Sequence, residues 1–107
     1  MNKDLQIAKR TVQAEIQALK KLSLSFNRSS HFSNAVNLLS KMKGKCLVVG
    51  VGKSYLVSLK VSATLSSLGT PSVAFSANDL QHGGLGAIQK NNDALLIFRV
   101  SGESSEL

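Results

Sequence analysis

The feature that most constrains the fold is a short apolar segment that ends in glycines. The run Cys46-Leu47-Val48-Val49 contains no polar residue, and Gly50-Val51-Gly52 follows it directly. An apolar run without polar alternation is typical of a strand buried on both faces, as in a parallel sheet that helices cover on each side. The run therefore predicts an α/β fold in which this segment is a buried strand.

Helices and two further strands are expected around it. Apolar side chains recur at spacings of three and four in residues 5–26 and 32–42, which predicts two amphipathic helices. Residues 53–68 predict a third helix, and residues 72–75 and 94–100 predict two more short strands. Strands that alternate with helices imply right-handed crossovers and a parallel sheet flanked by helices. A glycine-rich turn is expected between the last two strands.

The chain is expected to hold N-terminal helices in residues 1–43 and the first three strands of a sheet domain in residues 44–107. Ser101 would begin a helix that stops one turn later, and an isolated turn is too short to sustain itself. We therefore expect the chain to be a truncated piece of a longer domain.

Composition excludes several kinds of site. A single cysteine, Cys46, rules out an internal disulfide and a cysteine-based zinc site, so no metal is expected. Four Phe and one Tyr are too few for a base-stacking platform, and the 13 Lys and Arg form no basic tail. No run approaches the ~20 apolar residues of a membrane span. We expect a cytoplasmic protein without a nucleic-acid or membrane partner, whose net charge of +7 attracts smaller phosphorylated ligands.

Two loops follow predicted strands and precede predicted helices, at residues 50–54 and 101–106. In a parallel sheet both loops lie at the carboxyl edge, where open α/β folds bind ligands. Free backbone N–H groups and the helix dipole favour an anion there, and Lys53 adds a full positive charge. The pattern predicts a phosphate site.

The first loop fits neither of two well-known nucleotide motifs. The P-loop requires a glycine at the position that Leu47 occupies, and the dinucleotide fingerprint requires a third glycine where Tyr55 stands. Binding of a nucleoside triphosphate or a dinucleotide is therefore not expected.

Several segments match, in order and spacing, one family pattern: Val49-Gly50-Val51-Gly52-Lys53-Ser54, Ala63-Thr64-Leu65, Gly69-Thr70-Pro71-Ser72, Gln81-His82-Gly83, Leu85-Gly86 and Ser101-Gly102-Glu103-Ser104-Ser105-Glu106. With these motifs the chain resembles the sugar isomerase (SIS) domain, most closely its arabinose 5-phosphate isomerase branch. The resemblance implies a flavodoxin-like parallel sheet. It also implies an aldose–ketose isomerase that acts on phosphorylated sugars through an enediol-type intermediate, without an obligatory cofactor.

The resemblance also implies roles for individual residues. The implied phosphate-binding residues are Gly52, Ser54, Ser101, Gly102 and Ser104. The implied catalytic residues are Lys53, for charge at the substrate oxygens, His82, and Glu106, for acid–base work. Members of the family commonly assemble as dimers or tetramers, so a homo-oligomer is compatible with the resemblance.

Plainer structural roles remain open for the same residues. Ser101 and Ser104 would serve equally as helix caps, Lys53 as a solvated lysine, His82 as a turn residue and Glu106 as a surface carboxylate. Cys46 is expected in the core.

Several residues depart from the family pattern, among them Gly84, which stands where an acid is usual, Arg99 and Val100, and these departures bear on activity. Arg99 replaces a hydroxyl residue, and it either neutralises the phosphate or blocks the pocket. We expect weak or no isomerase activity from this chain alone. A non-catalytic sugar-phosphate-binding regulatory module and a decayed fragment without function remain as alternatives.

Overall fold

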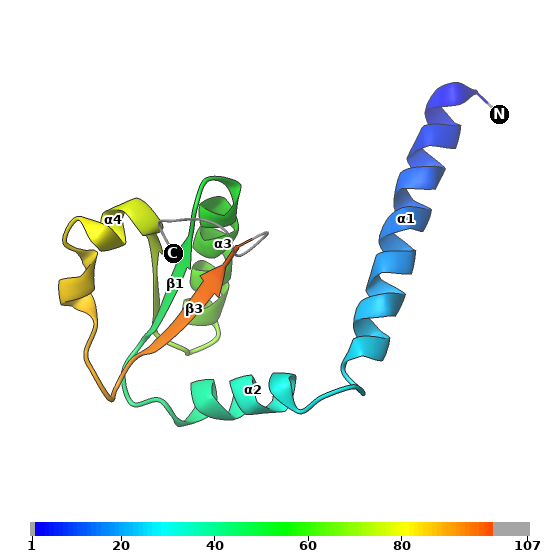
Figure 1. The fold of residues 1–107 in the computed structure, drawn as a ribbon. Helices are drawn as coiled ribbons and strands as arrows, with labels where there is room; N and C mark the ends of the chain where they lie inside the picture. Colours follow the sequence, from blue (N-terminus) through cyan, green and yellow to red (C-terminus); the bar gives the residue numbers. More distant parts are fainter. Residues whose placement is uncertain (1, 100–107) are drawn as a thin grey trace. The chain divides into compact units, whose positions relative to one another are not determined.

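The computed structural model describes residues 2–99 and divides into two compact units, Met1–Asn37 and Leu38–Leu107. Each unit is described separately (Figure 1). Four predicted site residues, Ser101, Gly102, Ser104 and Glu106, lie outside the described residues. The expected boundary between the N-terminal helices and the sheet domain, at residues 43 and 44, remains a prediction.

The first unit is dominated by the long helix α1 (Lys3–Ser25), as the apolar spacing predicts. The helix begins where the side-chain oxygen of Asn2 accepts a 2.8 Å hydrogen bond from the backbone N–H of Leu5, which satisfies one of its free donors. At the other end, the rings of Phe26 and Phe32 lie 4.9 Å apart between centroids. This contact joins the end of α1 to the beginning of α2 (His31–Lys41).

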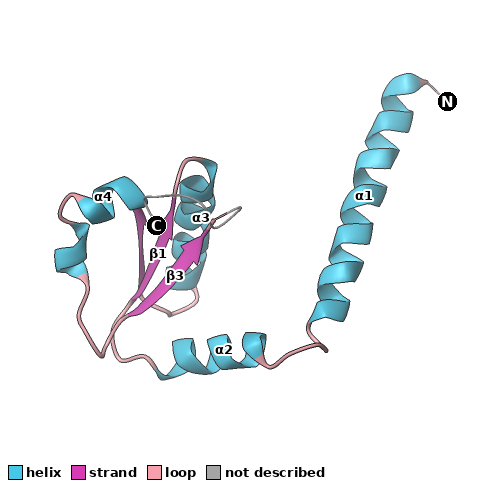
Figure 2. Ribbon diagram, in the orientation of Figure 1, coloured by secondary structure: helices cyan, strands magenta, loops and turns pink. Residues whose placement is uncertain are grey.

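The second unit holds a three-stranded parallel sheet in the order β2-β1-β3, which confirms the predicted fold class (Figure 2). Its strands are β1 (Cys46–Gly50), β2 (Ser72–Ser76) and β3 (Ala94–Phe98). The helix α3 (Lys53–Ser67) connects β1 to β2 and packs against both.

The segment between β2 and β3 is more ordered than the glycine-rich turn that the sequence predicts. It contains the helix α4 (Ala77–Gln81) and the 3-10 helix η1 (Gly84–Ala87). The hydroxyl of Ser76 accepts a 3.0 Å hydrogen bond from the N–H of Asp79 and thereby caps α4. The Ser76 cap favours a helix here, whereas the glycines that follow favour a turn in a prediction from sequence.

The core of this unit is β1. Cys46, Leu47, Val48 and Val49 are fully buried, and Ser58 and Ser62 are the buried residues of α3. Short serine side chains let the helix lie close to the sheet, and the Ser58 hydroxyl donates to the carbonyl of Ser54 at 2.8 Å. Burial raises the pKa of the Cys46 thiol above its ordinary value, so this cysteine behaves as an apolar core residue.

An ion pair ties the sheet together at the edge where its strands begin. The Asp93 carboxylate accepts hydrogen bonds from the Lys45 ammonium (2.9 Å), the Lys45 N–H (2.9 Å) and the Gln89 N–H (2.7 Å). The same ammonium donates to the carbonyl of Ala87 at 2.7 Å. A Cβ at Gly44 would collide with the carboxylate, so glycine is required beside it. The contacts fix the segment before β3 against the beginning of β1.

Replacement of Leu47 by alanine should lower the free energy of unfolding by about 2–5 kcal/mol, because it opens a cavity at a fully buried position. Chemical denaturation measures the change. The control is Leu68→Ala, since this side chain is 77% exposed and its loss should matter by less than about 0.5 kcal/mol. Equal effects of the two substitutions would contradict the assigned core.

The ion pair also predicts a dependence of stability on acid. The hydrogen bonds from the Lys45 ammonium, and then those from the Gln89 and Lys45 N–H groups, lower the pKa of Asp93 from 3.8 to about 2. Because the pKa is lower in the folded state, the ionised carboxylate stabilises the fold above about pH 4, and this contribution disappears as the pH falls towards 2.

Thermal unfolding of Asp93→Asn should therefore show a lower melting temperature at pH 7 and a smaller loss between pH 4 and 2 than the unsubstituted chain. Asp4→Asn, in α1, is the control because it removes a carboxylate from the other unit. A wild-type acid response in Asp93→Asn would show that another carboxylate controls it.

Candidate functional site

The turn between β1 and α3 lies at the carboxyl edge of the sheet. Gly52 precedes the helix with a φ of +56°, a left-handed conformation that favours glycine. No side chain caps α3, so the helix begins with backbone donors directed to its amino end. Donors and helix dipole together provide an environment that suits an anion.

The tight path of this turn depends on Gly50. A Cβ at Gly50 would lie only 2.5 Å from the carbonyl carbon and oxygen of Ser54 and 2.7 Å from the nitrogen of Tyr55. The backbone of α3 therefore approaches the last residue of β1 too closely for a side chain. Hydrogen bonds from the Ser54 N–H to the Val51 carbonyl and from the Tyr55 N–H to the Gly52 carbonyl, both 3.0 Å, hold the turn.

Three of the predicted site residues meet at this turn. Gly52 and Lys53 are exposed, and Ser54 is half-buried. Lys53 is the first residue of α3, and no ion pair involves its ammonium within residues 2–99. The N–H groups of Ser54 and Tyr55 are used within the turn, which leaves the N–H groups of Gly52 and Lys53 as its backbone donors. The turn thus presents these two donors, a hydroxyl and a cation in one short segment.

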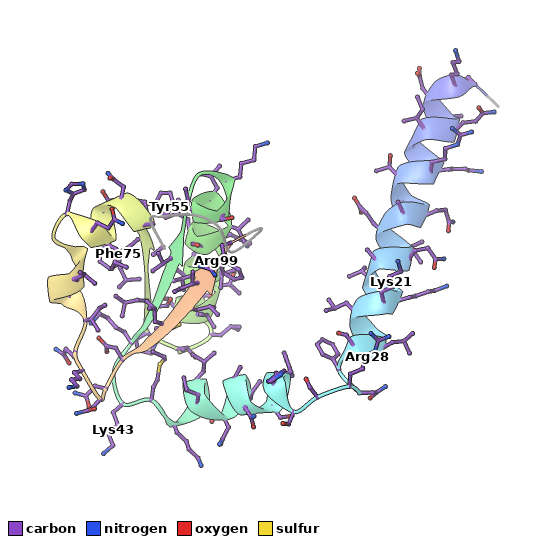
Figure 3. The ribbon with its side chains drawn as sticks, in the orientation of Figure 1. Lys21, Arg28, Lys43, Tyr55, Phe75 and Arg99 are labelled. Carbon is purple, nitrogen blue, oxygen red and sulfur yellow. The ribbon has the colours of Figure 1, made fainter. Side chains whose placement is uncertain are left out.

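The register of the sheet brings the end of β3 to the same edge. Gly50 pairs with Phe98, so the residue that follows β3, Arg99, stands beside the turn (Figure 3). The segment with Ser101, Gly102, Ser104 and Glu106 continues from this point in the sequence, outside the described residues. The ends of β1 and β3 therefore meet at one edge, and the position of the second loop remains a prediction.

His82 occupies a different place. Gly50 also pairs with Ser76, so α4 begins at the same edge and His82 follows at its far end, after five helical residues. Its N–H donates to the carbonyl of Asn78 at 3.1 Å, and its side chain is exposed. The described structure thus separates His82 from the turn by the length of α4.

Among residues 2–99, no cluster of three or more His, Cys, Asp or Glu side chains is placed to hold a metal ion. The described helices include none that is long and apolar enough to cross a membrane.

Comparison with known proteins identifies the fold. The model of the SIS domain family matches residues 38–107, which contain the sheet, α3 and the turn at Gly50–Ser54. The chain belongs to the SIS domain family. This confirms the family resemblance of the motifs.

The relatives of this SIS chain include named isomerases. It is 36% identical over 99 residues to arabinose 5-phosphate isomerase KpsF of Escherichia coli O6:H1, covering 92% of this chain and 30% of that protein. It is 39% identical over 100 residues to arabinose 5-phosphate isomerase KdsD of Pseudomonas aeruginosa, covering 94% of this chain and 30% of that protein. The chain therefore spans about a third of the length of these curated relatives.

A solved structure has the same architecture. A protein of E. coli CFT073, determined in complex with arabinose 5-phosphate, superimposes on this SIS chain with a TM-score of 0.84 and 32% sequence identity. The match covers 99% of this chain and 56% of that one. The parallel sheet flanked by helices is thus the SIS architecture.

The close approach at Gly50 gives a test of the turn. Gly50→Ala should lower the free energy of unfolding by about 1–3 kcal/mol, because the methyl group has no space beside the Ser54 carbonyl. The control is Gly86→Ala, where an added Cβ meets nothing within 4 Å. Denaturation curves measure both, and a Gly50 variant as stable as the Gly86 variant would contradict this geometry.

Proposed function

We propose that this SIS chain binds a phosphorylated sugar at the carboxyl edge of its sheet, as part of an aldose–ketose isomerase that acts on arabinose 5-phosphate. The observation that carries the proposal is the turn at residues 50–54. There the backbone N–H groups of Gly52 and Lys53, a hydroxyl, and a Lys53 ammonium that has no ion pair within residues 2–99 lie together. The phosphate group of a sugar phosphate is an anion that fits this turn. Arabinose 5-phosphate is proposed as the sugar because the relatives are named arabinose 5-phosphate isomerases.

In this proposal, the phosphate is held by the two segments that follow β1 and β3. Its ligands are the backbone of Gly52 and Gly102 and the hydroxyls of Ser54, Ser101 and Ser104. Donors at the amino end of a helix bind an anion without reorganisation, because the helix already orients them. The phosphate would thus anchor the substrate, while the sugar carbons extend towards the catalytic groups.

The proposed chemistry is a proton shift between two adjacent carbons. A base removes the proton from C2, the electrons pass to the C1 carbonyl through an enediol, and a proton returns to C1 as the C2 hydroxyl becomes the ketone. We assign acid–base work to Glu106, and positive charge at the substrate oxygens, those of the phosphate included, to Lys53. The position of His82 beyond α4 favours a supporting role for it over direct contact with the phosphate.

The same SIS chain could bind the sugar phosphate without turning it over, as a regulatory module does. His82 supports this second candidate, since α4 separates it from the turn. Ketose formation from arabinose 5-phosphate distinguishes the two, because a binding module would form the complex without the product.

Binding is tested by isothermal titration of the full chain with arabinose 5-phosphate and with arabinose, which lacks the phosphate. Only the phosphate ester should bind. Lys53→Met and Ser54→Ala should each weaken it roughly 10-fold or more, since a hydrogen bond to a charged group contributes about 1.5–3 kcal/mol. The matched control is Lys60→Met, which removes an exposed lysine from the same helix, further from its amino end.

Equal affinity for arabinose and its phosphate ester, or equal losses in Lys53→Met and Lys60→Met, would refute a phosphate site at this turn.

A further inference from the structure

The cation directly after β3 lies next to the proposed phosphate site. Val49 pairs with Ile97 and Gly50 with Phe98, and both strands end with this last pair, so Arg99 is the first residue beyond β3 at the edge where the turn begins. Adjacent strands lie only about 4.8 Å apart, a distance that a long arginine side chain spans easily. Figure 3 labels Arg99 at the end of β3.

No described acid neutralises this guanidinium. Within residues 2–99, the ion pair that forms is Lys45–Asp93, at the opposite edge of the sheet. Asp4 and Glu15 belong to the other compact unit, and Asp79 follows β2, on the far side of β1. The Arg99 side chain is exposed, so it is accessible to a ligand and is not packed in the core.

We propose that Arg99 is a specificity-determining residue that binds the phosphate of the sugar from the β3 side, across the turn from Lys53. This inference rests on the proposed function, and it decides between the two roles that the sequence leaves open. The guanidinium holds phosphate with two parallel N–H bonds and stays ionised at every relevant pH, whereas a lysine acts as a point charge. Two cations at one edge select a doubly charged phosphate ester over a neutral or singly charged sugar.

The experiment is titration of the full chain with arabinose 5-phosphate. Arg99→Ala should weaken binding at least 10-fold. Arg99→Lys should lose part of that affinity, because it keeps the charge but not the two parallel N–H donors of the guanidinium. The control Lys90→Ala removes one exposed cation from the turn before β3, at the opposite edge, and should leave the affinity unchanged.

The Arg99 Nε–H resonance provides a direct reading by NMR, because phosphate binding shifts it and a purely structural arginine would not respond. Melting curves of Arg99→Ala should match those of the unsubstituted chain, since the residue follows the strand and is exposed.

The outcomes separate the two proposals. If the unsubstituted chain does not bind arabinose 5-phosphate, both the function and this inference fail. If it binds and Arg99→Ala binds equally well, only the role of Arg99 fails. Tighter binding by Arg99→Ala would show that the arginine obstructs the site, which also overturns the inference.

Discussion

Burial of one apolar strand organises the second unit. The four residues Cys46-Leu47-Val48-Val49 lose all contact with water between β2, β3 and the covering segments. Such a strand must pair on both sides, since its backbone groups have no solvent to bond with. Because both partners run parallel to it, their carboxyl ends are brought to one edge. The proposed site exists because of that alignment.

The charged residues at the two edges of the sheet differ in whether they form ion pairs. At the amino edge, Lys45 and Asp93 form an ion pair and hydrogen-bond to the backbone around them, so these charges stabilise the fold. At the carboxyl edge, Lys53 and Arg99 form no ion pair within residues 2–99, and no side chain caps α3. A phosphate ester would pair with the cations at the carboxyl edge, as Asp93 pairs with Lys45 at the amino edge. This contrast is the physical basis of both proposals.

Much of the local structure was predictable. The apolar run, the glycine turn and the spacing in α1 and α3 lie within single segments, and each predicted element appears within a few residues of its expected bounds. The cap on α4 was missed because the glycines after it favour a turn and one serine hydroxyl decides otherwise. The predicted roles of Ser101, Gly102, Ser104 and Glu106 remain predictions, since these residues lie outside the described chain.

The sequence alone determined that this chain contains a buried parallel strand followed by a glycine turn and a helix. The apolar run, the glycines and the spacing of apolar side chains are each patterns of a few neighbouring residues. The tertiary structure alone decided that β1 lies between β2 and β3, and that Asp93 meets Lys45 across 48 positions of sequence. It also made β3 a direct neighbour of β1, so that no strand separates Arg99 from the turn. Pairing partners and register depend on contacts between distant segments, and no local pattern encodes which of them meet.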